Sequence, residues 1–332
     1  MNRLVLIDGN AIMHRAYHAL PPLTTPDGNV VNVVYGFVSI LLKLFHDLKP
    51  THVAVAFDRP GPTFREKLFI KYQAQRPKME DDFINQISLV HETVEAFGIP
   101  IYEMDGFEAD DILATLSRQA RNPKSEIRNK SKNQNSNKET IDQIIIVTGD
   151  RDILQLVEDE KVLVFMPTKG LSEGRLYGEK EVVERMGVTP KLVADLKALS
   201  GDPSDNYPGV TGIGPKTAAN LLREYGSVTG IYRSLEEVKG KKALITQATA
   251  SKLLAGRESA MLGLDLATIR RDAPIAFDEK SAIIETLDSP EIRKKLEEFH
   301  FPSLLKRLSG EKKVTGEKEK KKEKPNSQQQ LF

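Results

Sequence analysis

The feature that most constrains the fold is the alternation of short apolar runs with helical patterns in the first two thirds of the chain. The runs "RLVLI", "HVAVAF", "IPIYE" and "QIIIVT" are typical of strands, and helical patterns in "VVYGFVSILLKLFHDL", "DDFINQISLVHETVEAF" and "ADDILATLSRQ" separate them. Strands that alternate with helices predict a mainly parallel sheet covered by helices. Continuous apolar strands also fit burial on both faces. The predicted fold class is therefore α/β.

The pattern changes after about residue 185, where helical stretches with Gly-rich turns follow in "TPKLVADLKALSG", "GPKTAANLLREYG" and "ASKLLAGRESAMLGLDLATI". Residues 121–141 are polar and lack an apolar period, which predicts a disordered insert. Residues 306–332 form a low-complexity charged tail. We therefore expect an α/β domain at 1–184, a helical subdomain at 185–305 and a disordered tail at 306–332.

Composition excludes several kinds of site. The 332 residues include no cysteine, which excludes disulfides, thiolate metal sites and cysteine nucleophiles. The six histidines show no paired ligand spacing, so His14, His18 and His52 are interpreted as packing or surface residues. No apolar run approaches the roughly 18 residues of a membrane span, and the N-terminus lacks a secretory pattern. We expect a cytoplasmic protein with no membrane partner.

The net charge of +1 is a sum over unlike segments. Residues 121–139 carry six basic and two acidic residues, and residues 306–324 carry nine and four, so the remainder of the chain carries −8. Runs of charge are usually solvated surface. An acidic body with two basic appendages nevertheless suggests clustered carboxylates inside and contact with a polyanion outside.

Carboxylates follow every predicted strand: Asp8, Asp58, Glu108, Asp110, Asp111, Asp150 and Asp152. A further pair, Asp202 and Asp205, lies in "SGDPSDNYPG". One acid after a strand is ordinary, and the three acids of "GFEADD" alone would fit an exposed loop. Repetition after four strands favours a cluster, because the carboxyl ends of parallel strands meet at one edge of a sheet.

Nine carboxylates without nearby histidine or cysteine ligands match Mg²⁺ or Mn²⁺ better than zinc. Two such ions about 3.5–4 Å apart stabilise both the attacking and the leaving oxygens of a phosphodiester hydrolysis. The acids therefore predict a metal site that hydrolyses phosphodiesters.

Two further segments could hold a polyanionic substrate. "GPTFREKLFIKYQAQRPKM" interleaves basic residues with aromatic ones, which suits phosphates and unpaired bases, although an ordinary amphipathic helix with a solvated basic face is the alternative. "GVTGIGPKTAANLLREYG" places Gly209, Gly212 and Gly214 before a helix that should begin at Pro215 or Lys216. Such a turn lets backbone amides approach a phosphate, but it is a common pattern. No Walker motif is present, so nucleotide hydrolysis is not indicated.

With these residues in place, the chain resembles the flap endonuclease family, and within it the 5′-3′ exonuclease domain of bacterial DNA polymerase I. The resemblance covers about residues 1–305 and rests on "LIDGN", "FDRPGPTFR", "YQAQRP", "GFEADDIL", "TGDRDILQL", "GDPSDNYPGVTGIGPKTA" and "LATI". It implies a PIN-like α/β domain with a helical arch at about 60–98. It also implies a helix-three-turn-helix DNA-binding element in the helical subdomain.

The resemblance implies roles for individual residues. All nine acids stand at the family's metal-site positions, and the turn "GVTGIG" matches an element that holds K⁺. The implied arch residues near the scissile phosphate and the 5′ end are Arg65, Tyr72 and Arg76. The implied DNA-binding residues are Lys71, Gly212, Gly214, Lys216 and Thr217. The family usually has lysine after the arch tyrosine, whereas this chain has the neutral Gln73.

The C-terminal "QQQLF" is similar to the pentapeptide by which bacterial replication and repair proteins bind the sliding clamp. Gln328, Leu331 and Phe332 would then bind the clamp from a tether that leaves the nuclease mobile. A tail without function is the alternative, because so short a motif often occurs by chance.

The resemblance implies a Mg²⁺-dependent, structure-specific 5′-3′ exonuclease and flap endonuclease. We expect it to remove 5′ flaps or RNA primers in DNA replication and repair, as a monomer beside a separate DNA polymerase and ligase. One alternative is a non-catalytic protein that binds DNA junctions, which Gln73 would allow. The other is a PIN-type ribonuclease, which the helix-three-turn-helix pattern disfavours.

Overall fold

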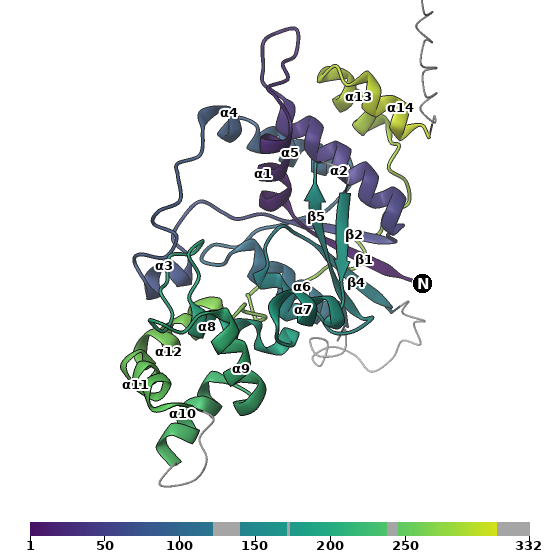
Figure 1. Cartoon of the computed structure of the whole chain (residues 1–332). Coiled ribbons are helices and arrows are strands. Elements are labelled where there is room, and N and C mark those ends of the chain that lie inside the picture. Colours follow the sequence, from purple (N-terminus) through teal and green to yellow (C-terminus); the bar gives the residue numbers. More distant parts are fainter. Residues whose placement is uncertain (122–139, 171–172, 238–244, 311–332) are drawn as a thin grey trace, which may run out of the picture.

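A single six-stranded sheet forms the centre of the structure, a computed structural model that describes residues 1–121, 140–170, 173–237 and 245–310 (Figure 1). Its strands are β1 (Arg3–Asp8), β2 (His52–Ala56), β3 (Ile101–Tyr102), β4 (Gln143–Val147), β5 (Val162–Lys169) and β6 (Glu173–Tyr177). They lie in the order β3-β2-β1-β4-β5-β6, and every neighbouring pair is parallel except β5 with β6. The predicted mainly parallel α/β sheet is confirmed.

The sequence analysis did not identify β5 and β6. The side chains of β5 alternate between buried and half-buried from Val162 to Pro167, which is a weaker signal than the continuous apolar runs of β1, β2 and β4. In β6 only Tyr177 is buried. This edge strand exists because it pairs with β5, and a local pattern does not report such a partner.

Alternating residues of β1 build two cores on opposite faces of the sheet. Leu4 and Leu6 pack in the core that contains α6 (Ala109–Arg121). Val5 and Ile7 pack in the core that contains α1 (Gly9–Ala19), α2 (Asn32–Leu48) and α5 (Ile87–Ala96).

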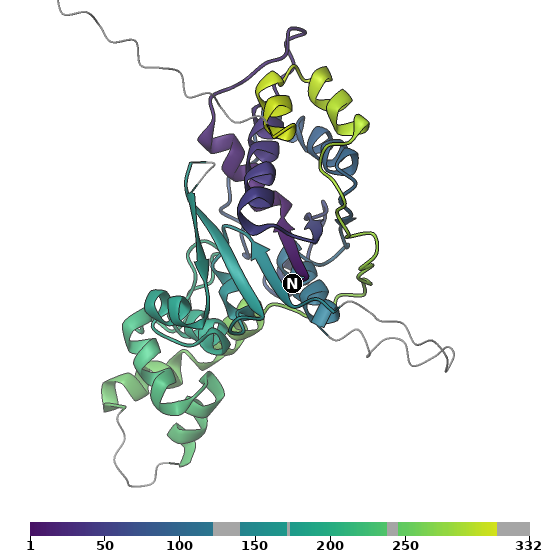
Figure 2. The same cartoon turned by 90° about the vertical axis from the view of Figure 1, so that its right-hand side faces the viewer.

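The last described helices, α13 (Pro290–Glu298) and α14 (Pro302–Leu308), join the core with α2 and α5 (Figure 2). The predicted tail therefore begins inside α14. The remainder of the tail from residue 311, and residues 122–139 of the predicted insert, lie outside the described residues.

The helix expected across "DDFINQISLVHETVEAF" is interrupted, because α4 (Asp81–Ile84) ends before α5 begins at Ile87. The buried side chain of Gln86 explains the interruption. Its Oε1 accepts a hydrogen bond of 2.8 Å from the backbone N–H of Val33, and its Nε2 donates to Asn32 at 3.1 Å. Gln86 therefore caps the first turn of α2, whose own N-cap residue supplies no side-chain acceptor.

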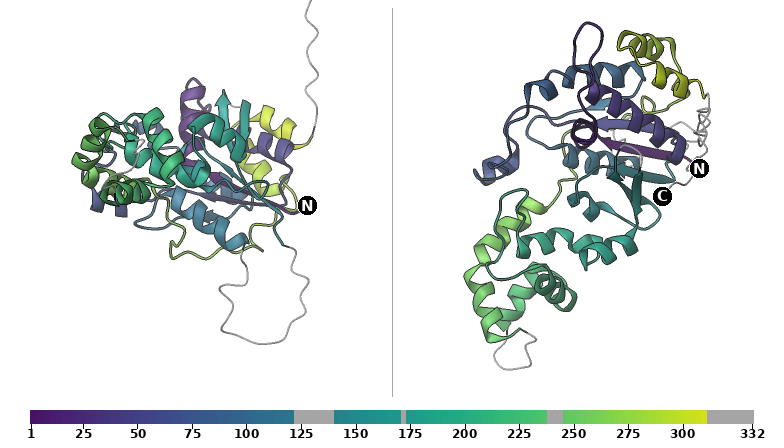
Figure 3. Two further views of the ribbon diagram at one scale, coloured as in Figure 1. Left: turned by 60° about the horizontal axis from the view of Figure 1, so that its bottom comes forward. Right: turned by 45° about the horizontal axis from the view of Figure 1, so that its top comes forward.

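Six helices that follow β6 lead into a lobe that extends away from the sheet (Figure 3), and they hold only the first part of the helical subdomain predicted at 185–305, because α13 packs in the core with α2 and α5. They are α7 (Glu179–Met186), α8 (Val193–Ser200), α9 (Pro215–Tyr225), α10 (Val228–Glu237), α11 (Gln247–Ala255) and α12 (Arg257–Ala267). Helix α9 begins at Pro215, as expected. Helices α8 and α12 approach closely at Gly263, where a Cβ would lie 3.1 Å from the Cα of Ala198. No helix in the described part of the chain is long and apolar enough to span a membrane.

Residues 268–277, here called the strap, lead from the end of α12 back along α6. Three α6 side chains spaced four residues apart accept hydrogen bonds from strap N–H groups: Asp111 from Arg270 at 2.7 Å, Thr115 from Ala273 at 3.1 Å and Gln119 from Phe277 at 2.7 Å. A four-residue spacing places these side chains on one face of the helix. The strap is therefore fixed to α6 along most of its length.

Replacement of Thr115 by valine tests this attachment. The Thr115 hydroxyl donates to the carbonyl of Asp111 and accepts from Ala273, whereas the equally buried Thr93 of α5 makes only the equivalent bond to Leu89. We expect Thr115→Val to lower the free energy of unfolding by about 1–3 kcal/mol more than Thr93→Val, because the buried N–H of Ala273 loses its acceptor. Urea unfolding measures both losses, and equal losses would contradict the attachment.

Candidate active site

The predicted acids gather at the carboxyl edge of the sheet, where the strand order reverses between β1 and β4. Asp8 is the last residue of β1, Asp58 follows β2, and Asp150 follows β4 (Figure 1). Ligand sites in open α/β sheets form in the crevice at such a reversal. The sheet therefore places acids from three separate strands at one crevice.

Asp8 links the ends of β1 and β4. Its Oδ1 accepts a hydrogen bond from the backbone N–H of Ala11 at 2.9 Å and so caps α1, while its Oδ2 accepts from the hydroxyl of Thr148 at 2.7 Å. Burial, followed by the charge of Asp58, raises the pKa of Asp8 to about 7. The carboxyl group is held firmly, yet no positive charge in the described part of the chain forms an ion pair with it.

The first turn of α6 brings further acids to the crevice. Asp58 accepts a hydrogen bond of 2.7 Å from the backbone N–H of Ala109, so a carboxylate from β2 caps this helix. Burial raises the pKa of Asp110 well above its ordinary value, and the charges of Asp150 and Asp8 raise it further. Because the charges of Asp8 and Asp150 both act on Asp110, and that of Asp150 also acts on Asp8, the three carboxyl groups are electrostatically close.

Arg65 supplies a positive charge to two of the three acids in "GFEADD", Glu108 and Asp111. This residue of α3 (Phe64–Leu68) is 2 % exposed. Its five guanidinium hydrogen bonds go to Glu108 once, Asp111 twice and the carbonyls of Leu266 and Thr268. An arginine has five N–H donors, so this side chain can supply no further donor.

Asp111 is fully buried, and both of its carboxylate oxygens accept hydrogen bonds. Besides the two bonds from Arg65, they accept from the backbone N–H groups of Arg270 at 2.7 Å and Glu108 at 3.2 Å. The sequence analysis grouped Asp111 with the metal-site acids and Arg65 with the residues near the scissile phosphate. In the structure the two form a buried ion pair with each other, and Arg65 also lines the pocket that contains Asp110 and Asp150.

Tyr72 is also buried, at 5 % exposure, in a small cluster with Tyr207 and Leu266. Its hydroxyl donates to Glu108 at 3.3 Å, and burial raises the pKa of the phenol. Tyr72 also lines the pocket that contains Asp110 and Asp150, and its predicted role near the 5′ end stays a prediction.

A second group of acids lies beside the first. Asp152, Asp202 and Asp205 are buried, and one carboxylate oxygen of each lies within 4.8 Å of the others, an arrangement that could hold a metal ion. Lys197 of α8 forms ion pairs with both Asp152 and Asp202. Burial would raise the pKa of Asp202, but Lys197 and Ser204 outweigh burial and leave that pKa below its ordinary value.

Lys197 was missed by the sequence analysis. The sequence pattern that could have identified it is a single cation between apolar residues of one helix, in "ADLKALSG". Its neighbours Leu196 and Ala198 are buried. A lysine in that position must reach a carboxylate or solvent. The sequence alone does not say which carboxylate.

The arch segment contacts the second group through Asp205. Oδ1 of Asp205 accepts hydrogen bonds of 3.0 Å from Nε2 of Gln73 and from Nη2 of Arg76. The backbone of Gln73 is in the left-handed region, with φ of 53°, and its N–H donates to the carbonyl of Asp205 at 3.1 Å. Gln73 therefore lies beside Asp205, while the side chain of Arg76 is half exposed.

The nine acids divide by their charge partners. Five form ion pairs with Arg65, Lys197 or Arg76, namely Glu108, Asp111, Asp152, Asp202 and Asp205. Within the described residues, four form none: Asp8, Asp58, Asp110 and Asp150. A crevice with four unpaired carboxylates and only oxygen donors fits a hard divalent cation.

The predicted DNA-binding residues lie on the surface. Lys71 is exposed in the arch, and Lys216 and Thr217 are exposed in the first turn of α9. In the turn before α9, the carbonyls of Gly209 and Gly212 accept from protein donors, Ser259 at 2.7 Å and Lys252 at 3.3 Å. The predicted K⁺ site in this turn stays a prediction.

Comparison with known proteins gives matches along most of the chain. Residues 3–187 match the 5′-3′ exonuclease N-terminal resolvase-like domain, and residues 188–290 match the 5′-3′ exonuclease C-terminal SAM fold. The chain is 38 % identical over 307 residues to DNA polymerase I of Mycobacterium tuberculosis and 39 % identical over 307 residues to that of Caldicellulosiruptor bescii. These matches cover 92 % of this chain but only 31 % and 33 % of the relatives, so the chain spans about a third of their length.

Solved structures show the same fold at lower identity. A bacteriophage T5 flap endonuclease in a pseudo-enzyme-product complex with DNA and metal ions matches with a TM-score of 0.64 and 20 % identity, over 93 % of this chain and all of that one. The catalytic core of Rad2 bound to a DNA substrate matches with a TM-score of 0.58 and 16 % identity, over 92 % of this chain and 91 % of that one. With both family models and these relatives in agreement with its motifs and its acidic crevice, the chain belongs to the 5′-3′ exonuclease family.

Proposed function

We propose that this chain is a metal-dependent 5′ nuclease that hydrolyses DNA phosphodiester bonds at 5′ flaps and removes RNA primers in replication and repair. The observation that carries the proposal is the set of four carboxylates without ion-pair partners, Asp8, Asp58, Asp110 and Asp150, at the strand-order reversal. The bound DNA and metal ions in the related bacteriophage T5 structure support the substrate class.

Asp8, Asp110 and Asp150 would hold one divalent cation, and Asp152, Asp202 and Asp205 offer the ligands for another. Bound Mg²⁺ or Mn²⁺ would lower the pKa of a water molecule and stabilise the charge that develops on the phosphate. Lys197 keeps Asp202 ionised, because its ammonium offsets the burial of that carboxyl group.

Arg65 and Asp111 act in this proposal as positioning residues. Arg65 holds the first turn of α6 against the end of α12, and Asp111 holds the strap through Arg270. The pair therefore fixes the direction in which Asp110 enters the crevice. Tyr72 has a similar role, because its hydroxyl fixes Glu108.

Exposed positive charges would bind the DNA. Arg76 and Lys71 lie beside the crevice, where they can neutralise phosphates of the cleaved strand. Lys216 and Thr217 open α9, whose first backbone N–H groups favour a phosphate of the duplex.

The further partners rest on the sequence alone. We propose a separate DNA polymerase and ligase, action in the cytoplasm at the nucleoid, and docking to a sliding clamp through Gln328, Leu331 and Phe332. These three residues lie outside the described part of the chain.

Asp150→Asn tests the metal role. Removal of one ligand charge should lower the rate of flap cleavage in Mg²⁺ by about a thousandfold, because a bound metal contributes several kcal/mol of transition-state stabilisation. Binding of the same flap DNA should be retained. Asp47→Asn, which removes an exposed acid of α2 paired with Lys43, is the control and should leave cleavage unchanged. Undiminished cleavage by Asp150→Asn would refute the proposal.

Gln73→Lys tests whether a missing charge limits the reaction and distinguishes a nuclease from a protein that only binds junctions. A lysine there would add a positive charge at the acids, and we expect the single-turnover rate to rise by up to about tenfold.

Gln75→Lys is the matched control for Gln73→Lys. Gln75 donates to the carbonyls of Pro203 and Ser204 instead of to a carboxylate, so the same charge enters the arch two residues after Gln73 without replacing a bond to an acid. Equal rate changes in both variants would show that the effect is general attraction of DNA. Cleavage that stays absent in the parent and in Gln73→Lys would favour the non-catalytic alternative.

The raised pKa of Asp8 predicts a pH-dependent effect of Mg²⁺ on stability. The ordinary pKa of 3.8 rises to about 7 in the fold, so the metal-free protein should lose stability as the pH increases from about 4 to 7 and the carboxyl ionises. Mg²⁺ compensates that charge and should therefore raise the Tm more at about pH 8 than at about pH 5.5. Thermal unfolding measures both shifts. Asp8→Asn should reduce the difference between the two pH values, and an identical shift at both would contradict the prediction.

A further inference from the structure

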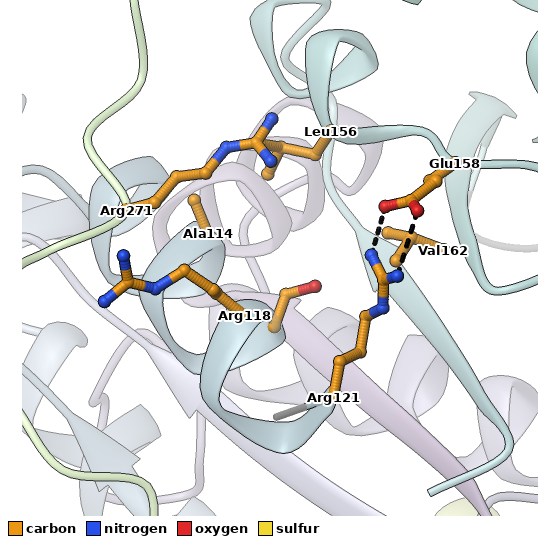
Figure 4. A pocket seen from close by; sticks show the side chains of 8 residues that line it. Ala114, Arg118, Arg121, Leu156, Glu158, Val162 and Arg271 are labelled. Atoms are coloured by element: carbon orange, nitrogen blue, oxygen red, sulfur yellow. Dashed lines mark hydrogen bonds and ion pairs between the residues drawn. The ribbon is translucent and has the colours of Figure 1, made fainter. Parts of the chain in front are cut away.

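A second pocket, of about 270 Å³, lies beside the middle and the last turn of α6 (Figure 4). The crevice acids occupy the first turn of α6, whereas Arg118 and Arg121 occupy its last turn. This pocket shares no lining residue with the acidic pocket that contains Asp110 and Asp150, so it is separate from the proposed metal site. Its lining residues are Ala114, Ser117, Arg118, Arg121, Leu156, Glu158, Val162 and Arg271.

Three arginines from two parts of the chain surround this pocket with one carboxylate among them. Arg121 forms an ion pair with Glu158, in which Nη2 lies 2.9 Å from Oε1. Arg271 of the strap donates to the carbonyl of Gln155 at 3.3 Å and forms no ion pair, while Arg118 has neither a hydrogen bond nor an ion pair within the described residues. Two guanidinium groups at the pocket therefore lack a counter-ion.

The ordinary role of basic residues in the last turn of a helix is to interact with the helix dipole, and this role accounts for Arg118 and Arg121. It does not account for Arg271, which the strap brings to the same pocket from a distant part of the sequence. Burial lowers the pKa of Arg271, and although Glu158 raises it, the charges of Arg121 and Arg118 lower it further. Arg118 and Arg271 are exposed, so water weakens this repulsion, but the three guanidinium groups share the single carboxylate of Glu158, which leaves the pocket with a net positive charge.

We propose that this arginine pocket, defined by Arg118, Arg121 and Arg271, binds a small anion that carries a phosphate group. Guanidinium groups match phosphate oxygens through paired N–H donors. The volume of about 270 Å³ lies just below the usual range for small-molecule pockets, which suits inorganic phosphate or a mononucleotide better than a DNA duplex.

Such an anion would add a connection between the strap and α6, because Arg271 precedes Ala273 in the strap and Arg118 lies between Thr115 and Gln119 in α6. Because Arg270, the neighbour of Arg271, bonds to Asp111, bound phosphate would stabilise the strap over the same stretch that holds the first turn of α6. The inference concerns binding and is independent of the nuclease reaction, so either can fail without the other.

Thermal unfolding of the full chain in EDTA, in sodium phosphate and in sodium chloride of equal ionic strength, tests the proposal. At about five times the Kd, linkage gives an expected rise in Tm of about 2–4 °C in phosphate over chloride. Arg271→Gln and Arg118→Gln should each remove most of this rise. In chloride, Arg271→Gln should leave the Tm unchanged or raise it, because a repelling charge is lost. A purely structural arginine would instead give a lower Tm.

Arg223→Gln is the matched control, because Arg223 is an exposed arginine in the last turn of α9 that does not line the pocket. It should keep the full rise in phosphate. Adenosine monophosphate in place of phosphate shows which anion the pocket binds. A larger rise in Tm at equal concentration indicates a nucleotide, and an equal or smaller rise indicates inorganic phosphate. The proposal is overturned if phosphate gives no rise, if the rise persists when Arg118 and Arg271 are both replaced, or if only duplex DNA gives a rise that these variants reduce.

Discussion

The buried pair of Arg65 and Asp111 is the interaction on which the rest of the site depends. Arg65 reaches three parts of the chain at once, because its donors end on the first turn of α6, on the end of α12 and on the strap. Removal of one member of such a pair would leave an uncompensated buried charge, at a cost of about 3–5 kcal/mol. Arg65 thus fixes Asp111, which is fully buried, and Glu108, which lines the same pocket as the unpaired acids Asp110 and Asp150.

The division of the acids into a set with ion-pair partners and a set without them connects the stability of the fold with metal binding. Carboxylates at the carboxyl edge of a sheet repel one another, and burial raises the cost of every ionised group. This chain pairs five of the nine with its own cations and leaves four without such a partner. Three of the paired acids, Asp152, Asp202 and Asp205, also lie close enough together to hold a metal ion. A site built in this way is least stable when empty and fully ionised, so the property that destabilises the metal-free fold is the same one that would make it bind metal.

Sequence patterns predicted the parts of this structure that local chemistry determines. The apolar runs located β1, β2 and β4. An acid after each run located the crevice, because the carboxyl ends of parallel strands lie at the same edge of a sheet. Patterns failed where a distant partner decides the outcome. The edge strand β6 exists through β5, the break before α5 exists because Gln86 caps α2, and Lys197 is defined by two acids from other segments. The motif also located Arg65 and Tyr72 without revealing that both are buried, because burial depends on α12 and its neighbours.

The path of the chain explains how the two groups of acids keep a fixed position relative to each other. Asp202 and Asp205 belong to the lobe that leaves the sheet after β6, whereas the other acids belong to the sheet and α6. A lobe attached at one end could rotate relative to the sheet and separate the groups. Here the chain returns along α6 as the strap and then pairs with β2, where Val53 donates to the carbonyl of Ala282 at 2.8 Å and Ile284 donates to that of Thr51 at 3.1 Å. Attachment at both ends restricts that rotation, and the geometry that a phosphodiester reaction needs is therefore set by backbone connections far from the reacting atoms.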